Sequence, residues 1–262
     1  MASSSLNSPS GGTNKSGYKR KDLDKLIFRN NGGASADKIR NDPKMAGTRK
    51  QISRFTACST AGKMVRTAML DVADLGHSLL AGKILSLCSS IMKMDTDNLP
   101  NGKQSILFSK GLHLLQGYNL NLQNVFDSIL STPVQFTLNR ELHLATVQLP
   151  PLIPGLNLRN QWNQPYFRFK INLGIIRDLA FNGVDYKPIT EDVQEHTELV
   201  ETPWASMADK YPEQQIELKF EDAVFDEHCH LLLAIGIEFG GVRHGGIVGI
   251  KDAGCGKIMG VV

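Results

Sequence analysis

The C-terminal half of the chain carries the two clearest strand patterns. Between Gln214 and Phe220, apolar and polar residues alternate, which is typical of a strand with one face on a core and one in water. Leu231–Phe239 has one charged residue in nine and is too short to span a bilayer, so it is predicted to be a buried central strand. The connection between them, Asp222–His230, is polar. Core and candidate site are therefore expected side by side.

Further strands are predicted upstream of these two. Alternation from Val134 to Leu138 and its return over Leu142–Leu149 predict a hairpin. A change of parity between Leu144 and Val147 predicts a β-bulge that switches the buried face. Phe167–Leu173 alternates regularly and predicts an amphipathic strand.

Shorter segments are less regular. Two apolar runs, Ser105–Ser109 and Leu112–Leu115, are strand candidates, and the acidic stretch Glu191–Glu201 is predicted to be an exposed excursion. Short strands separated by Gly, Pro and Asn, with no helix-length segments between them, favour an antiparallel sandwich over a parallel α/β sheet.

Residues 53–94 have helical periodicity instead. Apolar residues recur every three or four positions from Ala61 to Met94, which predicts one long amphipathic helix or two helices broken near Gly76 or Gly82. The turn-forming stretch 95–102 ends this region.

These patterns predict a mainly β protein, α+β overall: an antiparallel β-sandwich preceded by one or two amphipathic helices and a disordered basic N-terminal arm. The predicted divisions are a disordered tail over residues 1–22, a basic and helical region over 23–100 and the β-sandwich over 101–262.

Charge is distributed unevenly. Residues 1–54 hold 12 Lys and Arg against 4 Asp and Glu, net +8, which leaves 17 against 22, net −5, for the rest. Such a split is typical of an arm that binds a polyanion or docks on an acidic protein surface. The candidate contacts are Lys19, Arg20, Lys21, Arg49, Lys50 and Arg54.

Four scattered cysteines form no short-spaced disulfide framework, so free thiols in a reducing compartment are expected. No secretory signal pattern and no window of 18 apolar residues occurs. We therefore expect a protein without membrane insertion, cytoplasmic or part of a larger particle assembled there.

Motifs for common enzyme classes are missing. Gly-Lys occurs four times, at 62–63, 82–83, 102–103 and 256–257, but none has the upstream glycine and the following Ser or Thr of a phosphate-binding loop. No dinucleotide fingerprint and no Gly-x-Ser-x-Gly elbow is present. We expect no cofactor and no catalytic residues.

The connection before the buried strand is the densest group of potential metal ligands. In an extended segment His228 and His230 project on one face, where two imidazoles could share an ion, and Asp226 and His244 could complete the site. The spacing matches no zinc module, and a polar turn that enters a buried strand would look the same.

An aromatic cluster beside cations offers a second site. Trp162 and Tyr166 lie near Arg159 and Arg168, so they could stack a sugar or a base. Alternating aromatics are also typical of sheet core, with Trp162 the residue expected to be exposed.

A resemblance adds an architecture and no activity. The stretch Asn41–Phe55, the following Ala61–Lys63 and the strand Leu231–Phe239 resemble a group of uncharacterised Bacteroidetes proteins. In that group an Asn-Pro and Thr-Arg stretch precedes a helix and a β domain, whereas here Asp42 interrupts the Asn-Pro pair.

Three functions stay open from the sequence. The first is a non-enzymatic structural or assembly protein whose N-terminal arm and helix contact neighbouring subunits or an acidic partner, with non-specific nucleic acid as a possible partner. The alternatives are a carbohydrate- or peptide-binding sandwich and a metal-dependent enzyme with a site near 226–230.

Overall fold

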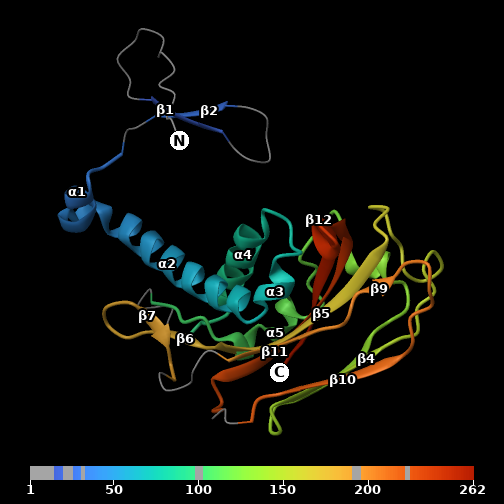
Figure 1. Cartoon of the computed structure of the whole chain (residues 1–262). Coiled ribbons are helices and arrows are strands. Elements are labelled where there is room, and N and C mark those ends of the chain that lie inside the picture. Colours follow the sequence, from blue (N-terminus) through green and yellow to red (C-terminus); the bar gives the residue numbers. More distant parts are fainter. Residues whose placement is uncertain (1–14, 20–25, 31–32, 98–102, 191–195, 222–224) are drawn as a thin grey trace. The chain divides into compact units, whose positions relative to one another are not determined.

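The computed structural model describes residues 15–19, 26–30, 33–97, 103–190, 196–221 and 225–262. These divide into two compact units at Ile52/Ser53, so the division differs from the boundary predicted after residue 100. Of the predicted disordered tail, Lys15–Lys19 forms a strand, and residues 1–14 and 20–22 lie outside the described part. Figure 1 gives the order of the elements.

The first unit combines a β-hairpin with short helical turns. Its elements are β1 (Lys15–Lys19), β2 (Leu26–Asn30), α1 (Ala36–Asn41), the 3-10 helix η1 (Pro43–Met45) and the start of α2 (Ala46–Thr67). β1 and β2 pair antiparallel. The Ser35 side chain caps α1 by accepting from the Lys38 N–H, and the Asp42 side chain caps η1 by accepting from the Lys44 N–H.

The second unit begins with helices. The helical region has the rest of α2, then α3 (Leu70–Ala73) and α4 (Leu80–Lys93), so the break falls between Thr67 and Leu80, in the part that contains Gly76 as predicted. Three short helical turns follow: η2 (Phe108–Lys110), α5 (Leu112–Leu115) and α6 (Phe126–Ile129).

Two antiparallel sheets form the β part of this unit. The smaller has the order β10-β4-β3 and the larger β12-β11-β5-β8, with β9 also pairing with β5 and a separate β6–β7 pair. The strands are β3 (Gln135–Asn139), β4 (Leu144–Leu149), β5 (Tyr166–Arg177), β6 (Leu179–Phe181), β7 (Tyr186–Pro188), β8 (Thr197–Glu201), β9 (Ala205–Ser206), β10 (Gln214–Lys219), β11 (Cys229–Arg243) and β12 (Gly246–Val261). The prediction of a mainly β fold with antiparallel sheets and an N-terminal helical region is confirmed.

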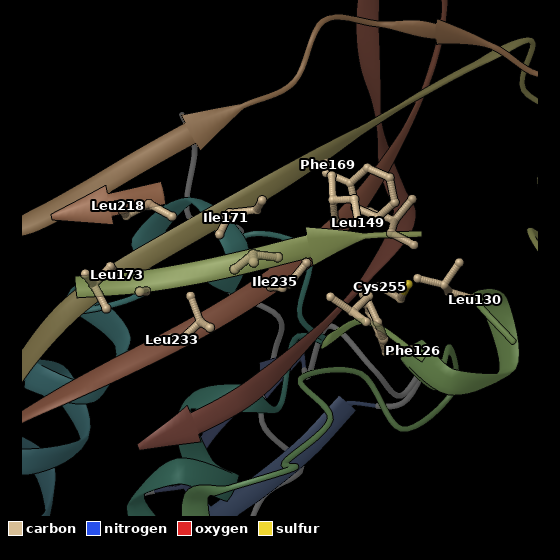
Figure 2. Packing of buried hydrophobic residues seen from close by; sticks show 14 of the residues in the cluster. Phe126, Leu130, Leu149, Phe169, Ile171, Leu173, Leu218, Leu233, Ile235 and Cys255 are labelled. Carbon is tan, nitrogen blue, oxygen red and sulfur yellow. The ribbon is translucent and has the colours of Figure 1, made fainter. Parts of the chain in front are cut away.

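Both faces of the larger sheet are covered, which makes three layers (Figure 1). One face packs on the smaller sheet around Phe169, Ile171 and Ile235, as Figure 2 shows. The other face packs on α2, α3 and α4 through residues such as Leu232 and Ile176. The predicted central strand, Leu231–Phe239, lies inside β11 and is buried apart from Glu238, which is partly exposed.

Covering both faces changes the environment of β5. Its pattern predicted one wet face, but from Phe169 to Arg177 every residue is buried. Lys170 and Asn172 lie on the helix side, and the Asn172 Oδ1 accepts a hydrogen bond from the Val72 N–H at 3.1 Å. A polar position on a strand thus became a buried contact to a helix, which alternation alone does not distinguish from solvent exposure.

The predicted hairpin is confirmed as β3–β4, but the β-bulge predicted between Leu144 and Val147 is not found. Pairing from Asn139↔Leu144 to Gln135↔Gln148 is continuous. Ala145, Val147 and Leu149 form the buried face, while Leu144 is only half-buried on the other. The small apolar Ala145 fills the inward position, so no change of face is needed.

Two strand predictions need correction. The Ser105–Ser109 and Leu112–Leu115 runs form a single bridge at Ile106, then η2 and α5, because short apolar runs fit a helical turn as well as a strand. Of the segment Glu191–Glu201, residues 191–195 lie outside the described part, and Thr197–Glu201 forms the edge strand β8, which is mostly exposed as predicted. β10 pairs with β4, so the two strands that flank residues 222–230 belong to different sheets.

A close approach of backbone to backbone lets the helices cover the sheet. A Cβ built on Gly174 of β5 would lie 2.0 Å from the carbonyl oxygen of Ala68, between α2 and α3. A Cβ on Gly236 of β11 would lie 2.5 Å from the Leu75 side chain. Only glycine leaves the room that this packing requires.

The mutation Gly174→Ala is therefore expected to destabilise the protein by about 2 kcal/mol or more, because the α2–α3 backbone would have to shift. The matched control is Gly82→Ala on α4, where a Cβ meets no atom within 4 Å. There the substitution should stabilise by about 0.5 to 1 kcal/mol. Urea unfolding of the two variants measures both values. An unchanged midpoint for Gly174→Ala would contradict the packing described here.

Candidate functional site

The segment predicted to bind metal lies against a carboxylate that the sequence did not single out. Asp178 follows β5 directly and is 1% exposed. Its Oδ1 accepts the Phe108 N–H at 2.6 Å, and its Oδ2 lies 3.3 Å from the His228 Nδ1. His230 Nε2 lies 3.3 Å from Asp178 Oδ1. Both histidines therefore face one buried carboxylate.

The two histidine contacts differ in kind. The His228 Nδ1 is within hydrogen-bond geometry of Asp178, while its ring is 30% exposed. The buried His230 Nε2 has no hydrogen-bond partner among the described residues. It lies close to Asp178 without the geometry of a hydrogen bond. Burying a carboxylate is costly unless hydrogen-bond donors surround it, and the Phe108 N–H and the His228 ring lie within hydrogen-bond distance of Asp178.

The predicted metal set is not assembled. His244 lies in the turn after β11, a strand of 15 residues, and is thus on the order of 40 Å from His230 at about 3.3 Å per residue. In the described part of the chain, no group of three or more His, Cys, Asp and Glu side chains is arranged to hold a metal ion. The pair that does come together, His228 and His230, is the pair expected to project on one face.

Asp226 fixes the turn before β11. Thr190 Oγ1 donates to its Oδ2, the His228 N–H donates to its Oδ1 at 2.9 Å, and Arg140 donates to its backbone oxygen. Burial alone would raise the pKa of Asp226, but hydrogen bonds, that from Thr190 first among them, outweigh it and hold the pKa below its usual value. Burial raises the pKa of the neighbouring Cys229 thiol to about 11, so this cysteine is not a thiolate nucleophile at neutral pH.

The candidate polyanion contacts are only partly free to bind. Arg49 donates to the backbone oxygens of Ile39 and Asp42 at 2.8 and 2.9 Å, and Arg54 donates to the Gln104 side chain at 2.8 Å. Lys50 is exposed. Lys19 ends β1, and the predicted contacts Arg20 and Lys21 lie outside the described residues.

The two aromatic candidates lie on opposite faces of the larger sheet. Trp162 packs against Phe239 with ring centroids 5.0 Å apart and is partly buried at the edge of the core between the sheets. Tyr166 precedes Phe167, whose side chain is in that core, so alternation directs Tyr166 to the other face. The structure does not bring Trp162 and Tyr166 into one ligand site.

Tyr166 instead shares its face with a charged network. Arg168 contacts both Glu201 and Glu238, the Glu238 pair at 2.7 Å, and Lys170 contacts the same two carboxylates at 3.5 and 3.3 Å. Trp204 lies 4.6 Å from the Arg168 guanidinium. Two cations thus balance two carboxylates, which leaves this network neutral. This network could not be predicted from sequence patterns, because its members lie on three different strands, β5, β8 and β11.

The helices offer no transmembrane span, since none in the described part is both long and apolar enough. All four cysteines are buried, and none forms a disulfide bond.

Comparison of the chain with models of known protein families, with curated proteins and with solved structures found no match. The resemblance to Bacteroidetes proteins is untouched by this result and stays a prediction. The geometry described above is therefore the basis for assigning a function.

The mutation Asp226→Asn should lower stability at pH 7 and matter less in acid. Because the folded-state pKa of Asp226 is lowered, its stabilisation is present above the unfolded value, about 3.9, and is lost as pH falls through the folded value. The difference in urea midpoint between wild type and variant should therefore shrink between about pH 5 and pH 3. Glu227→Gln, in the same turn and 87% exposed, is the control and should change little. A difference that grows as pH falls would refute the proposed role of the ionised carboxylate.

Proposed function

We propose that this protein is a non-enzymatic structural or assembly protein whose N-terminal unit and helix α2 engage a neighbouring copy of the same chain. The observation that carries the proposal is the uneven burial of α2. Its buried residues run from Ala57 to Val65, and none of Ala46–Thr56 is buried. The unburied stretch Ala46–Thr56 is about 11 residues long, and a helix segment of that length is marginal in water without packing.

An exposed aromatic side chain marks the same stretch. Phe55 is 62% exposed, although Phe is among the residues most often buried. A partner that covers this part of α2 would remove Phe55 from water and supply the packing that the helix lacks.

Charge supports a second copy as the partner. Within the first unit, Lys38, Arg40, Lys44 and Lys50 are exposed, and residues 1–54 carry net +8 against net −5 for the rest of the chain. Opposite net charges on two parts of one sequence favour contact between the N-terminal part of one copy and the remainder of another. The neutral network around Arg168 adds no competing charge.

The experiment is light scattering of the full chain over a concentration series. At about 50 mM salt, a mass of at least twice the 28.8 kDa chain mass is expected, with dissociation as salt rises. Phe55→Asp and the triple variant Lys38→Glu, Lys44→Glu, Lys50→Glu should each weaken assembly by about tenfold or more, since they remove an apolar contact and reverse exposed charges.

The control for Phe55→Asp is Val184→Asp, which changes an 87% exposed residue in the second unit and should leave the mass unchanged. A monomer at every concentration would refute the proposal. If that monomer instead binds duplex DNA with an affinity that falls steeply as salt rises, the function of the basic segment would be to bind a polyanion.

A further inference from the structure

A small apolar pocket lies between the start of α4 and the loop before α6. It has a volume of about 140 Å³ and is lined by His77, Leu79, Leu80, Lys83, Tyr118, Leu120, Leu122 and Gln123. Leu80 and Leu120 are buried, whereas Leu79 and Leu122 are 43% and 63% exposed. The pocket thus has a closed apolar floor and an open apolar rim.

The polar groups at this pocket include the His77 ring and the Lys83 cation. His77 Nδ1 accepts the Leu79 N–H at 3.2 Å, so the neutral ring carries its proton on Nε2 and can donate from there. The exposed Lys83 takes part in none of the ion pairs of the described residues. The lining contains no Asp or Glu.

The backbone holds both sides of the pocket in place. The His77 N–H donates to the Leu120 oxygen at 3.2 Å, and the Leu120 N–H donates to the Gly256 oxygen of β12 at 2.8 Å. The loop and the segment before α4 are therefore tied to the larger sheet, so the pocket is formed in advance of any ligand.

We propose that this pocket binds a small carboxylate with a compact aromatic body, such as benzoate. An apolar cavity of about 150 Å³ accommodates benzene, so the volume fits a single six-membered ring. The carboxylate would lie at the rim, where Lys83 supplies an opposite charge and His77 a donor. This binding function is separate from assembly through α2.

A basic segment of a neighbouring copy would fit this pocket less well than an anion does. The exposed cations of the N-terminal unit would meet Lys83 without an intervening carboxylate. The ligand is therefore inferred to be an anion.

The test is isothermal titration of the full-length protein with four probes: benzoate, benzyl alcohol, benzylamine and acetate. Benzoate should bind with a dissociation constant on the order of 1 mM or lower. Benzyl alcohol should bind several-fold more weakly because it lacks the charge, and benzylamine and acetate should not bind measurably.

Variants separate the pocket from general surface binding. Lys83→Gln should weaken benzoate by about three- to tenfold and leave benzyl alcohol unchanged. Leu122→Glu, at an exposed position on the rim, should weaken benzoate by about tenfold or more. Lys93→Gln, which removes an exposed lysine at the other end of α4, is the control and should have no effect.

Any one of three results would overturn the proposal. Benzoate could give no heat of binding up to about 10 mM, or benzylamine could bind as tightly as benzoate. The third is a benzoate affinity that neither Lys83→Gln nor Leu122→Glu changes.

Discussion

The contact between the glycines of the larger sheet and the segment joining α2 to α3 is the constraint on which the rest of this structure depends. Gly174 and Gly236 let the backbone at Ala68 and the side chains of Val72 and Leu75 approach the strands closely. A side chain at Gly174 would push this segment away and open the core beneath α4. Because this contact holds the helices against the larger sheet, both faces of that sheet are buried and neither is left exposed to solvent.

Burial on both faces leaves polar groups that need partners inside. Asn172 accepts a hydrogen bond from the Val72 N–H, and Asp178 accepts one from the Phe108 N–H. Asp178 also lies 3.3 Å from a ring nitrogen of His228 and of His230. These contacts join parts of the chain that are far apart in sequence. Removing Asn172 or Asp178 would leave a buried N–H, that of Val72 or of Phe108, without its partner. The best reading of the histidine cluster is thus structural: one carboxylate organises the entry into β11.

The sequence specified local structure better than it specified partners. The amphipathic helices, the β3–β4 hairpin and the buried core of β11 followed from periodicity alone. The burial of Asn172 could not be predicted, because it depends on a helix 100 residues earlier lying on that face. Asp178 was missed because its partners, the Phe108 N–H and His228, are 70 and 50 residues away in the chain. The bulge was predicted wrongly because Ala145 was not counted as a core residue.

The same distinction separates the candidate sites. Side chains that the sequence made conspicuous, such as Arg49, Arg54 and His228, are engaged by the protein's own groups. The groups still open to a partner are inconspicuous in sequence: the exposed half of α2 with Phe55, and the pocket rim with Lys83 and Leu122. Both places combine exposed apolar surface with lysines that form no ion pair among the described residues, and exposed apolar surface costs free energy until something covers it. The extent of α2 favours a protein partner, whereas the pocket near α4 has room for one ring only, so the two places select different classes of ligand.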